Sequence, residues 1–334
     1  MNAFPIRAAI TGTGSFLPEK TLTNDDLSKM VDTSDEWIYP RTGIRSRHIA
    51  DAGTQTSDMA AEAGRRALAA AGAKPEEIDL LVVATISGDT PLPATACLVQ
   101  RKIGLPNATA FDVLAACSGF LYALDVARQY VASGAARKVL VVGAEKMSAI
   151  TDWQDRTTCI LFGDGAGAAV VEPASEGSAN GILASCTGTD GSLAPLLHIE
   201  AGGSAMPASA ETLAARKGFV RMDGHTIFKY AVRNMASIAE KAVAAAGLRP
   251  GDIDWIVPHQ ANIRIISAVA KTMSAPPEKV VANIETTGNT TAGSIPIALD
   301  EAVRDGRVKP GDNVLFVAFG AGLTWAASVV RWGR

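Results

Sequence analysis

The chain has 334 residues, hydrophobic residues make up 48% of it, and its net charge is -3. This length predicts about two domains with a sizeable core, and the small negative charge argues against nucleic acid as the main partner. The four cysteines have no CxxC spacing and the four histidines are scattered, so neither a disulfide framework nor a metal site is predicted.

The N-terminal residues 1–16 contain no basic region followed by a long apolar stretch, so they do not resemble a signal peptide. The longest apolar runs, such as IDLLVVATI at 78–86, are too short to cross a bilayer. We therefore expect a cytoplasmic protein that does not act at a membrane.

Helices and buried strands alternate along the chain. Residues 57–72 form an Ala-rich amphipathic pattern that ends at a glycine, and a Pro-containing turn then leads to the apolar run at 80–86. A connection with a further helix precedes the next apolar run, at 138–144. Short runs of Val, Ile and Leu are typical of strands that are buried on both faces. The alternation predicts an α/β fold with largely parallel sheets covered by helices.

The chain contains an internal repeat. AGAKPEEID at 71–79 matches AGLRPGDID at 246–254, and the shift in residue number that superimposes these two stretches also aligns two later apolar strands. One shift that aligns several separated segments indicates two copies of one α/β unit. We expect these copies to span residues 1–175 and 176–334.

The stretch FDVLAACSGFLYAL at 111–124 carries a single cysteine, Cys117, among small and apolar residues. The repeat places Cys117 at the start of a buried helix, where free N–H groups and the helix dipole lower the pKa of a thiol and favour the thiolate. Two interpretations of this stretch remain open. Cys117 is a nucleophile beside a substrate site, or it is a small buried core residue.

Two stretches of the second copy carry polar residues at comparable places. WIVPHQAN at 255–262 puts His259 directly after a predicted buried strand, at the kind of strand end where α/β proteins build their sites. GNTTAGSIP at 288–296 aligns with the Cys117 stretch and puts Asn289 just before a predicted helix. Taken alone, His259 is equally well interpreted as a site residue or as a structural histidine. Asn289 is equally well interpreted as a site residue or as a turn or cap asparagine.

Together these stretches resemble the condensing enzymes of the thiolase superfamily, and most closely the β-ketoacyl-acyl carrier protein synthase III family, which initiates bacterial fatty-acid synthesis. The resemblance rests on DVLAACSGF at 112–120, VPHQANIRI at 257–265 and GNTTAGSIP at 288–296, and further matches run from the first strand to the last. Elongating synthases have a second histidine in place of Asn289. Thiolases have a second cysteine in the C-terminal turn, which here reads FGAG.

The resemblance implies a thiolase-like five-layered αβαβα fold of two duplicated halves with mixed, mainly parallel sheets. It also implies a homodimeric acyltransferase with ping-pong kinetics. Cys117 would take the acyl group of acetyl-CoA or another short acyl-CoA, and decarboxylative Claisen condensation with malonyl-acyl carrier protein would follow. Coenzyme A would be part of a substrate thioester, and no cofactor, nucleic acid or membrane would take part.

The same resemblance assigns the catalytic groups. The backbone amides of Cys117 and Ala321 would form an oxyanion hole, and His259 and Asn289 would donate hydrogen bonds to the malonyl thioester oxygen, where charge builds up. Phe319 would support decarboxylation as an apolar ring beside the cysteine. Ala321 stands where the family commonly has glycine, which a backbone donor tolerates if the local φ and ψ suit alanine.

Binding residues follow from the resemblance as well. Trp37 and Arg156 would sandwich the adenine of coenzyme A, and Arg41 would lie near its phosphates. Leu92 would close the acyl pocket of the partner subunit, where phenylalanine is frequent, so some breadth in the primer is expected. His225 stands where the family often has asparagine and is given no role. The remaining assignments are Met222, Gly224 and Asn262 for the pantetheine channel, and Arg264, Lys229 and Lys271 for the acyl carrier protein.

Other interpretations are weaker. The glycine cluster FGDGAGAAVV at 162–171 is similar to a dinucleotide-binding fingerprint, but a strand and not a helix is predicted after it. Within the family, the alternative is a specialised synthase III-like enzyme of polyketide, alkylquinolone or acyl-ester biosynthesis. Outside the enzymes, the alternative is a non-catalytic acyl-binding protein.

Overall fold

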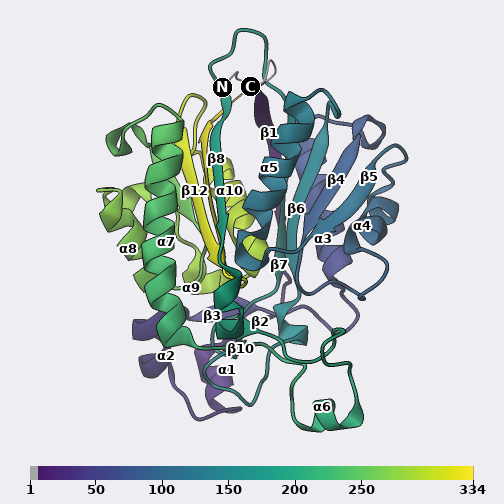
Figure 1. The fold of residues 1–334 in the computed structure, drawn as a ribbon, viewed down its shortest axis with the longest axis vertical. Coiled ribbons are helices and arrows are strands. Elements are labelled where there is room, and N and C mark those ends of the chain that lie inside the picture. Colours follow the sequence, from purple (N-terminus) through teal and green to yellow (C-terminus); the bar gives the residue numbers. More distant parts are fainter. Residues whose placement is uncertain (1–6, 334) are drawn as a thin grey trace.

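The computed structural model describes residues 7–333, which form five layers in the order helix, sheet, helix, sheet, helix (Figure 1). The αβαβα architecture expected from the sequence is therefore confirmed. Across the molecule, the helical layers are α3 (Thr56–Ala71) with α4 (Thr95–Ile103), α5 (Gly119–Ala132) with α10 (Ser294–Arg304), and α7 (Gly224–Ala245) with α8 (Ile263–Thr272).

The N-terminal sheet lies between α3 and α5. Its spatial order is β1 (Ala8–Phe16), β7 (Gly165–Pro173), β6 (Val139–Glu145), β4 (Leu80–Ala84) and β5 (Thr109–Val113). β4 runs parallel to its neighbours β5 and β6, whereas β7 runs antiparallel to β6 and β1. The carboxyl ends of β4, β5 and β6 therefore meet at one edge of the sheet.

The C-terminal sheet lies between α10 and α7. Its spatial order is β11 (Trp255–Pro258), β12 (Asn313–Gly320), β13 (Thr324–Arg331) and β8 (Gly181–Thr189). β11 and β12 are parallel, and the other two pairings are antiparallel. A single parallel bridge from Ile256 to Val280 stands where the first sheet has β5.

The sheets are mixed, as expected, but the expectation that they are mainly parallel is wrong. In the part of the chain that the structure describes, their strands make three parallel and four antiparallel pairings. Only residues 321–323 separate β12 from β13, so the second strand has to return antiparallel. An apolar run shows that a strand is covered on both faces but does not show its direction.

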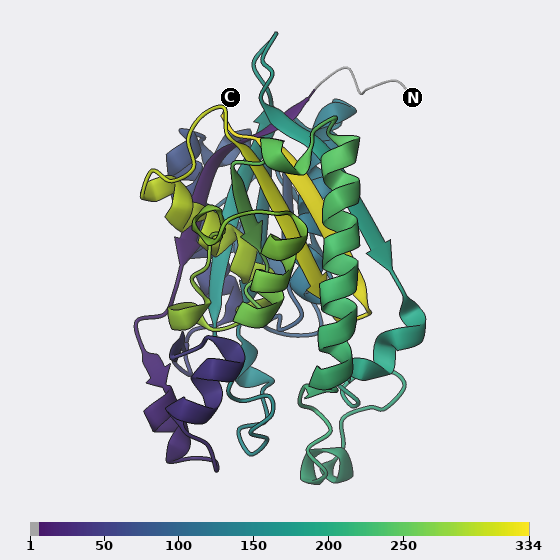
Figure 2. The same ribbon diagram turned by 90° about the vertical axis from the view of Figure 1, so that its left-hand side faces the viewer.

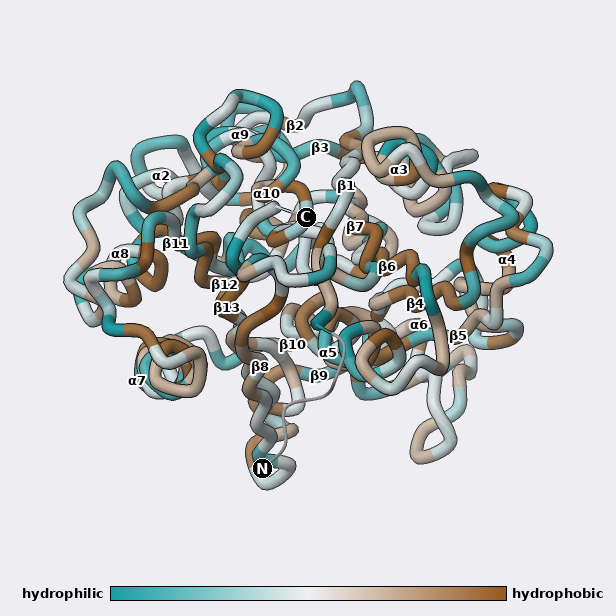
Figure 3. Tube along the Cα trace, turned by 90° about the horizontal axis from the view of Figure 1, so that it is seen from above, coloured by the Kyte–Doolittle hydropathy of each residue, from teal (hydrophilic) through white to brown (hydrophobic). Residues whose placement is uncertain are grey.

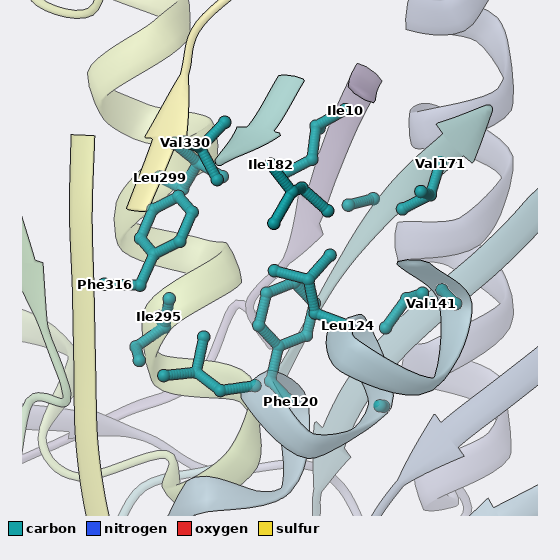
Figure 4. Close-up of a cluster of buried hydrophobic side chains, with 14 of the residues drawn as sticks. Ile10, Phe120, Leu124, Val141, Val171, Ile182, Ile295, Leu299, Phe316 and Val330 are labelled. Carbon is teal, nitrogen blue, oxygen red and sulfur yellow. The ribbon is translucent and has the colours of Figure 1, made fainter. Parts of the chain in front are cut away.

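The main hydrophobic core fills the space between the sheets, around α5 and α10 (Figure 4). Phe120 and Leu124 of α5 and Ile295 of α10 are at most 1% exposed, and they lie with Phe316 of β12 in the same cluster. Seen from above, hydrophobic residues concentrate in the sheets and in the helices that face them, and hydrophilic residues in the peripheral loops (Figure 3). The central helices are thus held from both sides.

The repeat is visible in the backbone. Ala116 and Thr291, which the shift of the repeat pairs with each other, have positive φ angles of 47° and 50°, and each begins a 3₁₀ turn that leads into a central helix. The first residues of these central helices, α5 and α10, are paired by the same shift. The boundary expected after residue 175 falls in the connection between β7 and β8 and stays a prediction. Residues 1–6 and 334, at the outer ends of the two expected units, lie outside the described residues.

Shorter elements gather at one end of the layers, at the bottom of Figure 2. The segment after β1 is held there by buried Arg47, which donates to the Ile160 carbonyl at 2.7 Å. The segment after β8 is held by ion pairs of Arg216 and Arg221 with buried Asp152. These elements are β2 (Thr21–Thr23), α1 (Asn24–Ser28), α2 (Asp35–Thr42), β3 (Ser46–His48), β9 (Leu197–His198), α6 (Ala210–Ala214), β10 (Arg221–Met222) and α9 (Ile284–Thr287).

Candidate functional site

Cys117 lies in the 3₁₀ turn Ala116–Ser118, between the end of β5 and the start of α5. The residue is only 8% exposed, and it forms part of the wall of a cavity of about 370 Å³, which we call the Cys117 cavity. A buried thiol beside a cavity of this size can meet a ligand without a large movement of the chain. The apolar part of the wall includes Ile86, Leu114, Met147, Phe162, Leu197 and Val220.

The end of β12 approaches the Cys117 turn so closely that only glycine fits there. A Cβ atom on Gly320 would lie 2.7 Å from the Cys117 backbone nitrogen and 3.2 Å from the Ala115 carbonyl oxygen. The next residue, Ala321, lines the Cys117 cavity and does not have a positive φ, so its backbone suits alanine. The two residues whose amides are predicted to form an oxyanion hole therefore border one cavity.

The thiol of Cys117 is harder to ionise than the sequence suggested. Burial raises the pKa of Cys117 to about 12, and the nearby charge of Glu145 adds to the rise. Hydrogen bonds from the local backbone and from the Thr291 side chain lower the pKa of Cys117, but they offset only part of this rise. The expectation that the helix start favours the thiolate is thus wrong for the free protein, because desolvation of the charged form outweighs the helix dipole.

His259 follows β11 directly and is buried. Its Nδ1 atom lies 2.6 Å from the hydroxyl oxygen of Ser294, the first residue of α10. Burial lowers the pKa of His259 to about 3, so the imidazole is neutral near pH 7. When Nδ1 accepts a hydrogen bond from Ser294, the ring proton sits on Nε2, which can then donate to a ligand.

Asn289 is buried, and its amide has a defined orientation. The side-chain oxygen accepts a hydrogen bond from the Thr291 N–H at 2.9 Å, which directs the NH₂ group to the other side. Backbone hydrogen bonds tie Asn289 to the neighbouring segment, from its N–H to Leu161 and from the Gly163 N–H to its carbonyl. The amide can therefore act as a donor at any pH at which the protein is folded.

The 3₁₀ turn Thr291–Gly293 connects these groups. Thr291 lines the Cys117 cavity and holds Asn289, and the residue after the turn, Ser294, holds His259. A Cβ atom on Gly119, at the start of α5, would lie 3.6 Å from the Cβ of Ala292, so the two helix starts are in contact. One turn of the second half thus links the cavity that Cys117 lines to the imidazole of His259 and the carboxamide of Asn289.

Phe319, which was predicted to lie beside Cys117, belongs to a different part of the core. It is buried at the end of β12 and belongs to the core cluster of α7, α8 and β13, together with Leu323. Neighbouring residues of a strand point to opposite faces, and Gly320 faces the Cys117 turn. In this structure Phe319 therefore packs mainly against the outer helical layer.

Two residues of the site were missed by the sequence analysis. Ser294 gives no signal, because the repeat pairs it with a glycine, Gly119. Glu145 could have been noticed, since it follows the apolar run at 138–144 directly and thus stands at a strand end. It is fully buried, its carboxylate accepts hydrogen bonds from Thr85, Ile86 and Ser87, and burial raises its pKa to about 7.

Four of the six residues predicted to bind coenzyme A gather around α2. The guanidinium carbons of Arg41 and Arg156 lie 4.8 Å and 5.2 Å from the centre of the Trp37 ring. Asn262, at the start of α8, donates to the Arg41 carbonyl at 2.8 Å. Two cations on one indole form a surface that can hold a flat base and phosphates. Met222 and Gly224 lie apart from this group, in β10 and at the start of α7.

The three basic residues predicted to meet a carrier protein are all exposed. Lys229 lies on α7, and Arg264 and Lys271 lie near the two ends of α8. The Arg264 guanidinium carbon lies 5.1 Å from the ring centre of Phe228, which ties the first turn of α8 to α7. His225, in the first turn of α7, is exposed too. The contact of the three basic residues with a carrier protein stays a prediction.

The predicted pocket gate, Leu92, is 86% exposed. Leu114, which lines the Cys117 cavity directly after β5, is 79% exposed. β5 is the edge strand of its sheet, and Leu114 follows it directly. Leu92 stands three residues before Thr95, whose N–H donates to Asp112 of β5. Among residues 7–333, no group of three or more His, Cys, Asp or Glu is placed to hold a metal ion, and no helix could span a membrane.

Comparison with known proteins gives consistent matches over the whole length. Two family models match, 3-oxoacyl-[acyl-carrier-protein (ACP)] synthase III over residues 111–191 and its C-terminal part over residues 243–332. A β-ketoacyl-[acyl-carrier-protein] synthase III of Caldanaerobacter subterraneus is 53% identical over 329 residues, covering 98% of this chain and 99% of the relative. One of Erythrobacter litoralis is 52% identical over 329 residues, covering 98% and 100%.

Solved structures agree. The 3-oxoacyl-[acyl-carrier-protein] synthase III of Aquifex aeolicus is 47% identical, with a TM-score of 0.90 and coverage of 97% of this chain and 100% of that one. The priming β-ketosynthase of the R1128 polyketide pathway is 36% identical, with a TM-score of 0.91 and coverage of 100% and 99%.

Proposed function

Because the chain belongs to the β-ketoacyl-acyl carrier protein synthase III family of acyl-transferring condensing enzymes, we propose that Cys117 carries the acyl group between its two half-reactions. The primer is acetyl-CoA or another short acyl-CoA, and the acceptor is malonyl-acyl carrier protein. One observation supports this most strongly: a buried thiol lines a mainly apolar cavity, and one turn of the other half links that cavity to an oriented carboxamide and a neutral imidazole.

In the first half-reaction, the sulfur of Cys117 attacks the thioester carbonyl of the primer. The new sulfur–carbon bond forms, the bond from the carbonyl carbon to the coenzyme A sulfur breaks, and coenzyme A leaves as a thiol with the proton that Cys117 gives up. Backbone N–H groups of Cys117 and Ala321 stabilise the oxyanion of the tetrahedral intermediate. Because the free thiol is protonated near pH 7, this proton has to leave as the substrate binds.

In the second half-reaction, the malonyl carboxylate leaves as carbon dioxide and an enolate remains. His259 Nε2 and the Asn289 amide donate hydrogen bonds to the thioester oxygen that carries its charge. The enolate carbon then attacks the acyl carbon, a carbon–carbon bond forms, and the bond to the Cys117 sulfur breaks. A neutral imidazole suits this role because it donates without forming an ion pair with the malonyl carboxylate that must leave.

The two partner surfaces follow from the charges outside the cavity. Trp37, Arg41 and Arg156 would bind the adenine and phosphates of coenzyme A, with Met222, Gly224 and Asn262 along the pantetheine arm. Exposed Arg264, Lys229 and Lys271 would attract an acidic carrier protein.

We further propose a homodimer built on the open edge of β5. A paired edge is more favourable than an exposed one, and exposed Leu92 and Leu114 would be buried in the contact. Leu114 already lines the Cys117 cavity, so a second copy would complete its wall and place the partner's Leu92 there. The cytoplasmic location and the absence of a cofactor stay predictions.

Primer loading tests the proposal directly. Incubation with acetyl-CoA should add the mass of one acetyl group to the protein, and the gain should vanish in Cys117→Ala but persist in Cys97→Ala, which removes an exposed cysteine. Loss of an acetyl group from the loaded protein on addition of malonyl-acyl carrier protein would show the second half-reaction. Acetylation that persists in Cys117→Ala would contradict the assignment.

The polyketide alternative remains a second candidate, because a priming β-ketosynthase of a polyketide pathway matches the whole chain. A panel of acyl-CoA primers of increasing length separates the two. Turnover of acetyl and propionyl primers favours fatty-acid initiation, whereas turnover of only long or aromatic primers favours the specialised enzyme.

A further inference from the structure

Glu145 is a buried acid that the two half-reactions leave without a role. It stands at the carboxyl end of β6 and is 0% exposed. All its hydrogen-bond donors are uncharged: the Thr85 hydroxyl at 3.1 Å, the Ile86 N–H at 3.1 Å, and both the N–H and the hydroxyl of Ser87. None of these hydrogen-bond donors carries a positive charge that would neutralise the carboxylate.

The internal repeat shows where Glu145 stands relative to the two turns. The shift of the repeat pairs Glu145 with Gly320, which lies against the backbone of the turn Ala116–Ser118. By the same symmetry the end of β6 lies against the turn Thr291–Gly293, and a Cβ on Gly143 would indeed collide with the Ala292 carbonyl. Glu145 is therefore placed behind the contact between the starts of α5 and α10, and Cys117 lies in the turn that leads into α5.

Glu145 is also placed behind the wall of the Cys117 cavity. Ile86, whose N–H it binds, lines that cavity, and so does Met147, two residues further along the chain. Ser87 in turn accepts a hydrogen bond from the Lys146 N–H at 2.8 Å, so the loop 85–87 is tied to the end of β6 from both sides. The position of this part of the cavity wall thus depends on the Glu145 side chain.

From this placement, and resting on the proposed function, we propose that Glu145 is a positioning residue for primer loading. Its carboxylate holds the cavity wall at Ile86, and its place at the end of β6 puts a negative charge behind the contact of the two helix starts.

The other charged groups near Glu145 do not cancel that charge. The ammonium of Lys146, the next residue, binds the carbonyl oxygens of Asp51 and Thr54. Directly before β7, whose first residue Gly165 pairs with Glu145, stands Asp164. Its carboxylate accepts hydrogen bonds from Ser148 and from the Ala50 N–H. On the second half, His259 is kept neutral by burial. The Glu145 charge is therefore the main one that acts on Cys117.

The coupling predicts a characteristic pH dependence. Burial raises the pKa of Glu145 to about 7, so Glu145 is neutral well below that pH and charged well above it. Its charge raises the pKa of Cys117. The thiolate fraction should thus rise with pH, level off just above about pH 7 as Glu145 ionises, and then rise again, which is the behaviour of two interacting groups.

The test is the rate of Cys117 modification by methyl methanethiosulfonate between about pH 5.5 and 9.5, read by mass spectrometry of the Cys117 peptide. Cys97, which is exposed, serves as an internal reference. In the unmodified chain we expect a plateau in the logarithm of the rate just above about pH 7. In Glu145→Gln, which keeps one acceptor oxygen, the plateau should vanish, and at about pH 9 the rate should exceed that of the unmodified chain about tenfold.

At about pH 5.5, where the side chain at this position is neutral in both proteins, the two should react equally fast. Asp164→Asn removes another buried carboxylate and should keep the plateau. A rate that rises by one logarithmic unit per pH unit throughout in the unmodified chain would overturn the proposal, as would equal acceleration in Asp164→Asn. The profile of the unmodified chain decides the question even if Glu145→Gln does not fold. Acetylation of Cys117, measured separately, tests the proposed function itself.

Discussion

Replacing Gly320 by alanine tests whether the amide of Cys117 is a working oxyanion donor. The new Cβ atom would lie 2.7 Å from the Cys117 nitrogen, 3.1 Å from the Ser118 nitrogen and 3.2 Å from the Ala115 oxygen. All three are backbone atoms, so no side chain can rotate away and the turn itself has to move. Overpacking of this kind costs about 1–3 kcal/mol of folding free energy.

The effect on catalysis should be larger than the effect on stability. If the Cys117 N–H moves away from the oxyanion, acetylation by acetyl-CoA should slow by about 10²–10³-fold, the usual cost of one lost donor. Intact-mass kinetics measure the acetylation rate, and thermal unfolding shows how much of the protein remains folded. Gly53→Ala is the control, because no atom lies within 4 Å of its added Cβ and its φ is not positive. If folded Gly320→Ala is acetylated at the normal rate, the Cys117 amide does not stabilise the oxyanion.

Three further outcomes are expected. Ser294→Ala removes the hydrogen-bond partner of His259 Nδ1 and should slow the malonyl half-reaction by about 10–100-fold while acetylation persists. Equal slowing of both half-reactions would show that Ser294 does not act through His259 alone. Because the pKa of His259 is lowered in the folded state, only the unfolded state takes up a proton on this residue between pH 6.5 and about 3. The free energy of unfolding should therefore fall as the pH drops through this window. Urea unfolding should show a smaller fall in His259→Asn. Trp37→Ala and Arg156→Ala should raise KM for acetyl-CoA but leave KM for acetyl-pantetheine unchanged, and parallel rises for both substrates would place these residues away from the adenine.

Much of the architecture could be predicted because it is encoded locally. Glycine and proline end the helix–turn–strand units, and apolar periodicity separates buried strands from amphipathic helices. The repeat predicted more than the fold: it placed Cys117 at a helix start, and the paired positions Ala116 and Thr291 share the same unusual backbone conformation. Such conformations depend on the few residues around them and survive duplication.

The direction of the strands could not be predicted in the same way. Apolar runs such as those of β6 and β12 have the same appearance in parallel and antiparallel sheets. The short turn at 321–323 and the connection from β6 to β7 decided the direction, because they lack the length or the helix that a parallel crossover needs.

The sequence by itself determined the family, the layered fold and the choice of Cys117, His259 and Asn289 as candidate site residues, because motifs and periodicity are written in neighbouring residues. Only the tertiary structure decided their chemical state. Burial of Cys117 and His259 sets which forms are charged, and partners distant in sequence, Glu145 and Ser294, surround them. Desolvation and long-range contacts depend on which segments pack together, and no local stretch of the chain contains that information.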